Sequence, residues 1–117
     1  MAFVYSILTE ITTLPGTVGA VYTNAASTTA YIRSITLHNA NTTTEAVILW
    51  NVPDNGGAGG TAADTNQFFS QSLLADETVI IEWPAPGLQL EDTNDTIQAD
   101  TTTASKVTIQ IMGAKET

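Results

Sequence analysis

Val107-Thr108-Ile109-Gln110-Ile111-Met112 is the stretch of this 117-residue chain that decides its fold class. Three β-branched apolar residues alternate there with Thr108, Gln110 and Met112, which gives one apolar and one mostly polar face and the period of two expected of a β-strand. Helical heptads are missing, and threonine beside Val, Ile, Tyr or Ala recurs along the chain. These residue types suit a pleated surface, so we expect an all-β protein.

Eight further stretches complete a predicted set of short strands. The stretch 31–39 also alternates, but Arg33 interrupts its apolar face, so we expect Arg33 at a sheet end or an interface. The stretches 46–50 and 78–83 are apolar on both faces, as in central or covered strands. Weaker candidates span 3–8, 18–23, 67–73, 87–90 and 96–100, and one or two helical turns fit 62–71. About eight or nine short strands separated by turn signals predict an antiparallel β-sandwich of jelly-roll or Greek-key type.

Length sets the expected domain organisation. A chain of 117 residues fits a single domain, 1–117. At this size folding buries about two-thirds of the unfolded surface, so the margin of stability is small and self-association would increase it. The segment 1–16 has two interpretations. Its apolar start, Phe3-Val4-Tyr5, belongs to an ordinary edge strand or to an arm that pairs with a neighbouring subunit.

The charge balance excludes several classes of partner. Twelve acidic residues stand against three basic ones, Arg33, Lys106 and Lys115, for a net charge of −9. Nucleic-acid binding requires a basic surface that neutralises phosphates, and attraction to an anionic membrane requires the same. The chain has no cysteine, which excludes disulfides and thiolate chemistry. No stretch reads as a membrane span or a signal peptide, so we expect a chain made in the cytosol and not cleaved.

Neither the glycine-rich loop nor the single histidine indicates catalysis. The loop 53–66 contains Gly56-Gly57-Ala58-Gly59-Gly60 but lacks the Lys of a phosphate-binding P-loop. We expect a long surface loop that is mobile or ordered by a partner. His38 shares a strand face with Ser34 but lies about 13 Å from it, at ~3.3 Å per residue, too far for a Ser-His pair. We therefore expect no enzyme, no cofactor and no small-molecule substrate.

An acidic turn leaves a metal site open as an alternative. Glu91, Asp92 and Asp95 crowd one turn, and Asp100 follows after the next strand. Oxygen-rich turns can hold calcium, but the spacing is not that of an EF-hand loop. A solvated turn with no metal is the favoured interpretation.

The aromatic residues also have two interpretations. Trp50 and Trp83 both lie at strand ends, and Phe68 and Phe69 lie in a further predicted strand. Aromatic residues in strands most often pack in a core or at an interface. A sugar-binding platform is the alternative.

Three stretches resemble small β-sandwich proteins encoded among the head and tail genes of tailed bacteriophages. They are Thr29–Asn39 (TAYIRSITLHN), Leu74–Glu82 (LADETVIIE) and Leu88–Ala99 (LQLEDTNDTIQA). In the third stretch relatives often have Gly just before the Asp-x-Ile, where this chain has Asn94, a residue that also tolerates a positive φ. The resemblance covers about residues 18–112 and consists of strands and turns.

The resemblance implies a non-enzymatic virion component, in particular a capsid decoration (cement) protein. Such a protein binds the outer head surface and stabilises capsomer contacts. Its implied partners are further copies of itself, commonly as a homotrimer, and the major capsid protein. As contact residues we expect Phe3, Val4, Tyr5, Arg33 and Trp83. The alternative, suggested by the aromatic and Asn/Asp/Thr content of the loops, is a carbohydrate- or receptor-binding module of a phage fibre or tail tip.

Overall fold

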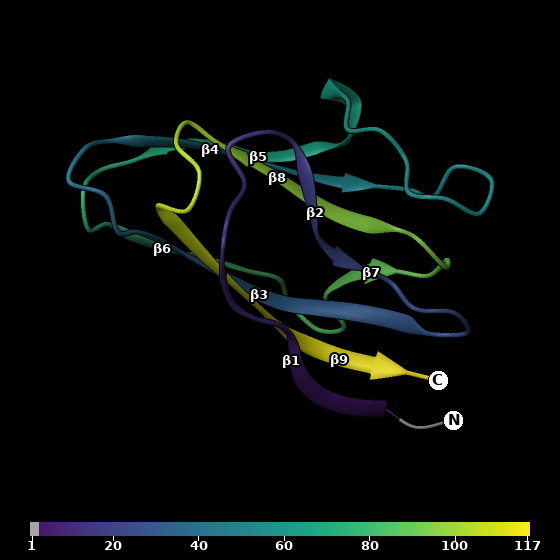
Figure 1. The fold of residues 1–117 in the computed structure, drawn as a ribbon. Coiled ribbons are helices and arrows are strands. Elements are labelled where there is room, and N and C mark those ends of the chain that lie inside the picture. Colours follow the sequence, from purple (N-terminus) through teal and green to yellow (C-terminus); the bar gives the residue numbers. More distant parts are fainter. Residues whose placement is uncertain (1–2) are drawn as a thin grey trace.

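Residues 3–117, the part of the chain that the computed structural model describes, form nine β-strands and one short 3-10 helix. Side chains are described from Ser6 onward. The strands lie in two antiparallel sheets packed face to face (Figure 1). In chain order they are β1 (Phe3–Thr13), β2 (Gly19–Thr23), β3 (Thr29–Asn39), β4 (Glu45–Val52), β5 (Gln67–Leu73), β6 (Thr78–Glu82), β7 (Leu88–Leu90), β8 (Thr96–Thr101) and β9 (Val107–Glu116).

The order of the strands is that of a jelly roll. Sheet A has the order β1-β9-β3-β6, and β7 pairs with β3 beyond the end of β6. Sheet B has the order β2-β8-β4-β5. Most successive strands alternate between the two sheets, so strands that pair are usually distant in sequence. The arrangement confirms the predicted antiparallel β-sandwich, and each of the nine predicted stretches contains a strand.

The predicted period of two appears in the burial of β9. Val107, Ile109 and Ile111 are buried, whereas Met112 faces solvent. The inner faces of the two sheets meet in one hydrophobic cluster, as expected when each strand buries every second residue. Strands of both sheets contribute side chains to this cluster, including those of Ile35, Leu37, Val47, Leu49, Leu73, Leu90 and Ile97.

The N-terminal segment is an edge strand of its own chain's sheet. β1 pairs with β9 from Phe3 opposite Glu116 to Thr13 opposite Thr108, with register shifts after Ile7 and Thr9. Past the first shift the Thr9 hydroxyl donates a hydrogen bond to the Val21 carbonyl of β2 at 3.0 Å. β1 therefore runs along sheet A and then reaches the edge of sheet B. In this single chain the described residues of the segment 1–16 pair with their own β9, and residues 1 and 2 lie outside the described part.

The helical turns expected within 62–71 are reduced to a 3-10 turn at Asp64–Asn66. β5 begins directly afterwards at Gln67, because Phe68 and Phe69 pack against the core from a strand that pairs with β4. Among the described residues, no helix is long and apolar enough to cross a membrane.

Two buried asparagines hold the loops at the ends of the sandwich. The side-chain amide of Asn24 donates to three backbone carbonyls, those of Thr28, Leu90 and Asp92, at 2.7, 3.2 and 3.1 Å. The amide of Asn39 donates to the carbonyls of Thr43, Leu73 and Leu74 at 2.9, 3.0 and 3.1 Å. Each amide joins turns that are far apart in sequence, and each satisfies carbonyls that burial would otherwise leave unpaired.

Candidate functional site

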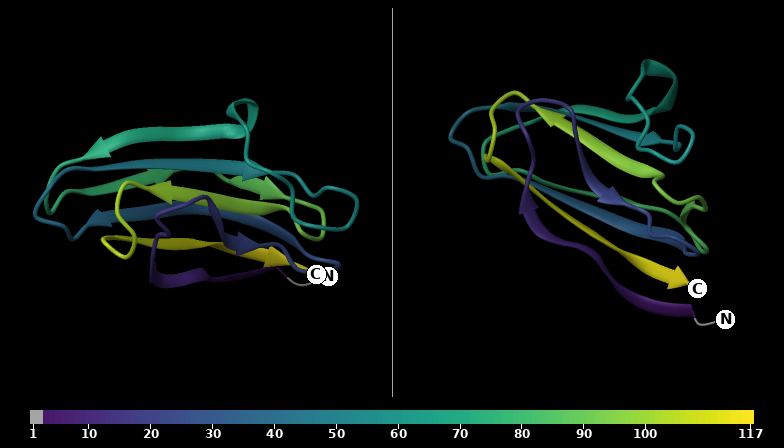
Figure 2. Two further views of the ribbon diagram at one scale, coloured as in Figure 1. Left: turned by 45° about the horizontal axis from the view of Figure 1, so that its top comes forward. Right: turned by 45° about the vertical axis from the view of Figure 1, so that its right-hand side comes forward.

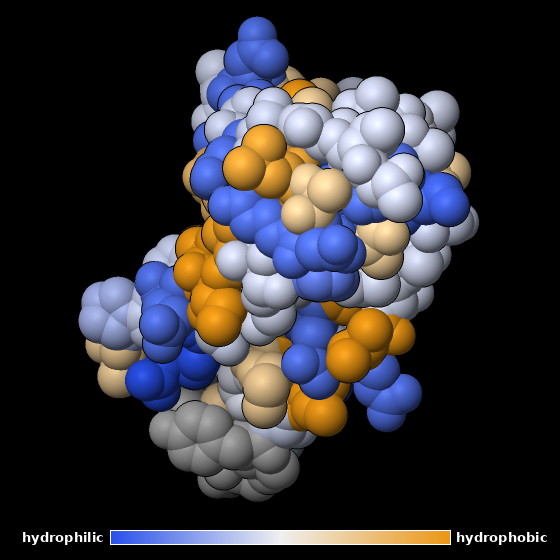
Figure 3. Space-filling model, turned by 90° about the vertical axis from the view of Figure 1, so that its left-hand side faces the viewer, coloured by the Kyte–Doolittle hydropathy of each residue, from blue (hydrophilic) through white to orange (hydrophobic). Residues whose placement is uncertain are grey.

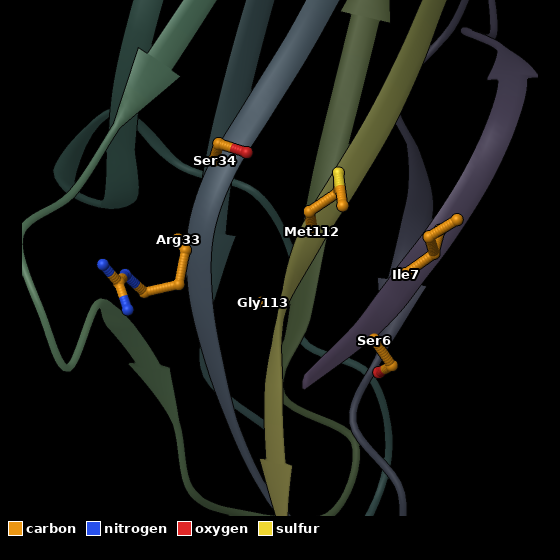
Figure 4. Close-up of a pocket in the computed structure, with 6 residues that line it drawn as sticks. All are labelled: Ser6, Ile7, Arg33, Ser34, Met112 and Gly113. Atoms are coloured by element: carbon orange, nitrogen blue, oxygen red, sulfur yellow. The ribbon is translucent and has the colours of Figure 1, made fainter. Parts of the chain in front are cut away.

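A β-bulge in β3 lies beside a shallow depression on the outer face of sheet A, the face turned away from the core. The pairing of β3 with β9 shifts register between Ile32 and Ser34, so Arg33 is the extra residue of the bulge. The depression has a volume of ≈ 620 Å³ and is open to solvent. Three adjacent strands line it, through Ser6, Ile7, Arg33, Ser34, Met112 and Gly113 (Figure 4).

Gly113 allows β3 and β9 to approach closely at this bulge. A Cβ atom on Gly113 would collide with the carbonyl oxygen of Tyr31 and would lie 3.1 Å from the Cα of Ile32. Only glycine therefore fits here without a shift of the β3 backbone. The bulge and the glycine together shape the wall of the depression.

Arg33 lines the depression, and its side chain extends from β3 on the side away from Met112 and Ile7, toward the gap between β6 and β7 (Figure 4). Its neighbours in β3 define that gap, since Ser34 pairs with Glu82 at the end of β6 and Ile32 pairs with Leu88 at the start of β7. Within the described part of the chain, its Nε is buried without a hydrogen-bond partner. Arg33 thus occupies a bulge inside a strand, at the break between two short partner strands.

The rest of the outer face of sheet A is a pleated surface of hydroxyl, amide and apolar side chains. Ile7 and Met112 lie opposite each other near one edge, with exposed fractions of 46% and 44%. Ile80, on β6 at the other edge, is 59% exposed. Between them lie mainly small polar residues. Two rows cross the sheet, one of Ile7, Met112, Ser34 and Glu82 and one of Gln110, Thr36 and Ile80.

The remaining exposed hydrophobic residues are scattered. Ile11, Val18 and Leu74 lie in β1, before β2 and in the β5–β6 turn. At the end of the sandwich seen in Figure 3, hydrophobic atoms form small groups separated by polar ones. Singly exposed apolar residues are ordinary on protein surfaces. The outer face of sheet A, with its depression, is therefore the main candidate for an interaction surface.

The two tryptophans do not form a shared exposed platform. Trp50 is buried, with 7% of its surface exposed. Trp83 is half-buried and packs edge-on against Phe68, with ring centroids 5.8 Å apart. Its backbone N–H donates to the carbonyl of Arg33 at 3.0 Å. Trp83 and Arg33 are therefore neighbours, and both help to anchor the loop between β6 and β7.

The glycine-rich loop is held by its own chain. Gln98 donates from its side-chain amide to the Gly60 carbonyl at 2.9 Å, and Asn94 donates to the Gly57 carbonyl at 2.6 Å. A Cβ on Gly60 would collide with the Pro53 carbonyl oxygen, so the loop returns closely to the end of β4. The sequence predicts a loop that is mobile or ordered by a partner; within its own chain the loop contacts β8 and the β7–β8 turn through these two hydrogen bonds.

The acidic turn meets an acid that the sequence did not place with it. Carboxylate oxygens of Asp54, Asp92 and Asp95 lie within 4.8 Å of one another, whereas Glu91 and Asp100 are not part of this group. Asp95 already accepts hydrogen bonds from the backbone N–H groups of Asp54 and Asp92, at 2.8 and 3.1 Å. These bonds give the three acids a role in joining two turns. Among the described residues, these three acids form the group whose carboxylate oxygens lie close enough together to hold a cation.

His38 lies in the outer row beside β6. Its Nδ1 is 2.8 Å from the hydroxyl of Thr78, its neighbour across the pair β3–β6. Ser34 lies on the same strand face two rows away, with the row of Thr36 between them. The described residues therefore do not join His38 to a serine nucleophile and an orienting carboxylate, the arrangement of a Ser-His-Asp hydrolase.

Comparison with family models and with curated proteins gives no relative from which a role can be carried over. No family model matches the chain, and no curated protein shows significant similarity to it.

The residues that the sequence predicted to make contacts lie in two places. Phe3, Val4 and Tyr5 form the start of β1, with side chains outside the described part, and Arg33 and Trp83 meet at the β6–β7 loop.

Proposed function

We propose that this chain is a non-enzymatic structural protein of a tailed-phage virion, a decoration protein that binds the outer head surface. It assembles with further copies of itself, as a trimer in the form that the resemblance implies, and it contacts the major capsid protein. The support from sequence is the resemblance of 29–39, 74–82 and 88–99 to phage β-sandwich proteins. The support from structure is the jelly-roll order of the strands, an architecture found among capsid and lectin domains. Fold alone does not determine function.

The single observation that carries the proposal is the outer face of sheet A. It presents three exposed apolar residues, Ile7, Ile80 and Met112, among hydroxyl and amide groups. A surface of mixed apolar and neutral polar groups suits contact with another protein. The titratable groups on it, such as His38 and Glu82, do not converge on one point. Binding, rather than chemistry, is what this face is suited to.

Stabilisation of a capsid follows from linkage. A protein that binds across the joint between two capsomers binds only the assembled shell, so its binding free energy adds to the cost of opening that joint. A β-sandwich suits this role because its two sheets share one packed core, and a close-packed core resists deformation. No catalytic group is needed for this role.

The direct test is binding to purified expanded heads, measured by co-sedimentation and by the melting temperature of the heads. We expect the protein to sediment with the heads and to raise their melting temperature. Ile80→Lys, which places a charge on the outer face, should weaken binding. Leu74→Lys is the matched control, because Leu74 is equally apolar and exposed but lies in the β5–β6 turn. Absence of both sedimentation and stabilisation would overturn the proposal.

The alternative, a carbohydrate- or receptor-binding module, has less support. A sugar platform needs exposed aromatic faces, but Trp50 is buried and Trp83 packs against Phe68. A glycan array tests it directly. Hits that disappear in Trp83→Ala, with the fold intact, would favour the alternative over capsid binding.

A further inference from the structure

The first half of β1 is an unprotected sheet edge. β1 is the terminal strand of sheet A, and in the described residues its only strand partner is β9 (Figure 2). From Phe3 to Ile7 the register with β9 runs without a break, and the shifts begin only after Ile7. The sequence of this segment, FVYSI, has no charge, no proline and no glycine. Proteins usually protect such an edge with a charge, a proline, a bulge or a covering element, and among the described residues this segment has none of these.

The remaining three edges of the sandwich are protected. The β2 edge is contacted by β1, through the hydrogen bond from Thr9 to the Val21 carbonyl. The β6 and β7 edge is broken by the loop around Arg33, and Glu82 ends β6.

The β5 edge is interrupted by a bulge. Its pairing with β4 shifts register between Leu49 and Trp50, so Phe68 is an extra residue without a partner position in β4. Such a bulge opposes pairing of an edge strand with another chain. The start of β1, which has no bulge and no charge, is therefore the edge on which two copies of this chain of net charge −9 can pair.

We propose that residues 3–7 of β1 pair antiparallel with the same residues of a second copy, about a two-fold axis at Tyr5. Sheet A then continues from one copy into the other. This inference names one self-contact of the assembly and to that extent rests on the proposed function. The pairing is closed, since each copy contributes the same edge and no edge remains for a third copy.

Sequence and register both fit this axis. A two-fold axis at Tyr5 places Phe3 opposite Ile7 of the other copy and Val4 opposite Ser6. No charged residue enters the new ladder. On β9, the nearest ionisable residues are Lys115 and Glu116, opposite Val4 and Phe3, and they carry opposite charges. A contact of five residues per strand is small, so we expect reversible, concentration-dependent association.

Sedimentation velocity over a concentration series, up to the solubility limit, tests the pairing. We expect an even number of copies at high concentration: a dimer, or a hexamer if the two-fold contact joins trimers. Ile7→Lys places a charge at each end of the paired segment and should weaken association by about tenfold or more. Ile80→Lys is the matched control, because it changes an exposed Ile to Lys on the same face at the far edge.

Three results would overturn the inference: a wild-type protein that stays monomeric throughout the series, an assembly of odd copy number, or equal weakening by Ile7→Lys and Ile80→Lys. Circular dichroism confirms that both variants fold. Binding to heads is measured separately. A wild-type protein that binds heads but does not pair refutes the two-fold contact alone, and a wild-type protein that pairs but does not bind heads refutes the capsid role alone.

Disulfide trapping locates the axis. The chain has no cysteine, so a single introduced thiol cannot pair within one molecule. Tyr5→Cys should form a covalent dimer under mild oxidation, because position 5 meets itself across the axis. Val4→Cys, Ser6→Cys and Thr78→Cys should form much less. Equal trapping at all four positions would show that collisions, rather than a defined register, produce the dimer.

Discussion

At the scale of single residues, backbone geometry limits what sheet A tolerates. Gly113 lies against the Tyr31 carbonyl at the bulge, and its hydrogen cannot be replaced by a methyl group without moving β3. The adjacent depression depends on the same geometry. One glycine thus contributes both to the stability of the β3–β9 ladder and to the shape of the outer face.

Gly113→Ala should destabilise the fold by about 3 kcal/mol, since the added carbon forces the two strands apart. Urea unfolding followed by circular dichroism measures the loss. Gly59→Ala is the control, because a Cβ there meets nothing within 4 Å and the backbone does not adopt a positive φ. That control should change stability by less than about 0.5 kcal/mol. Equal effects of the two variants would contradict the steric account.

Asn39 gives a second prediction at this scale. Its amide donates to three carbonyls at the β3–β4 and β5–β6 turns. Asn39→Asp keeps the size but replaces the donor with an oxygen that faces those carbonyls, so we expect a loss of about 3 kcal/mol or more at pH 7. Asn51→Asp, at a half-buried position of β4, is the comparison. Thermal unfolding of both variants compares their losses of stability. Equal losses would show that Asn39 only fills space and that its hydrogen bonds do not stabilise the fold.

At the scale of elements, a single carboxylate connects the start of β4 to the turn before β9. Glu45 is buried and accepts hydrogen bonds from the Asn41 side chain at 3.0 Å and the Thr103 backbone N–H at 2.8 Å. Burial alone raises the pKa of Glu45. The hydrogen bonds from Asn41 and Thr103, with the nearby charge of Lys106, outweigh it and leave the pKa below its usual value of 4.5.

This lowered pKa predicts an acid-sensitive fold. Because the folded-state pKa lies below the unfolded one, the contribution of Glu45 to stability is complete above about pH 4.5 and is lost as pH falls through the folded pKa. Glu45→Gln should therefore lower stability at pH 7 and flatten the decline of unfolding free energy below pH 4.5. Chemical denaturation between pH 7 and 3 measures both. An unchanged acid slope in the variant would refute the assignment.

The elements themselves were predictable, but their partners were not. The stretches 107–112 and 31–39 show a period of two that depends on local burial alone, so sequence indicates the strands. That β9 lies between β1 and β3 follows from packing across the chain, which alternation does not encode.

The same limit applies to the candidate sites. Asp54 joins Asp92 and Asp95 across 41 residues, and Asn24 reaches Leu90 across 66; no local motif marks either contact. The bulge at Arg33 had a partial signal, because a charge interrupts the apolar face there. The sequence contains no signal that β1 and β9 would line the depression together.

At the scale of the whole molecule, charge is unevenly distributed. All three basic residues, Arg33, Lys106 and Lys115, lie in or directly before strands of sheet A. The turns that join the strands carry acids at several places, among them Asp54, Asp76 and Asp92. The net charge of −9 opposes both compact folding and self-association through repulsion among these acids.

Salt should therefore stabilise the protein. Raising sodium chloride from low to moderate concentration screens repulsion between exposed acids, so we expect the melting temperature to rise by a few degrees. Self-association should strengthen over the same range. Differential scanning calorimetry and sedimentation at matched salt concentrations measure the two effects. A melting temperature that falls with sodium chloride would show that attraction between opposite charges dominates instead.

The place of β9 between β1 and β3 has a consequence for how the chain is made. Ribosomes deliver the strands in order at about 5–20 residues per second, so β1 emerges first and waits for a partner that comes roughly a hundred residues later. Until residues 107–116 have left the ribosome, sheet A lacks the strand that connects its edge to its centre. Nascent chains stalled before residue 107 should therefore be protease-sensitive throughout β1, and those released after residue 116 should become resistant in one late step.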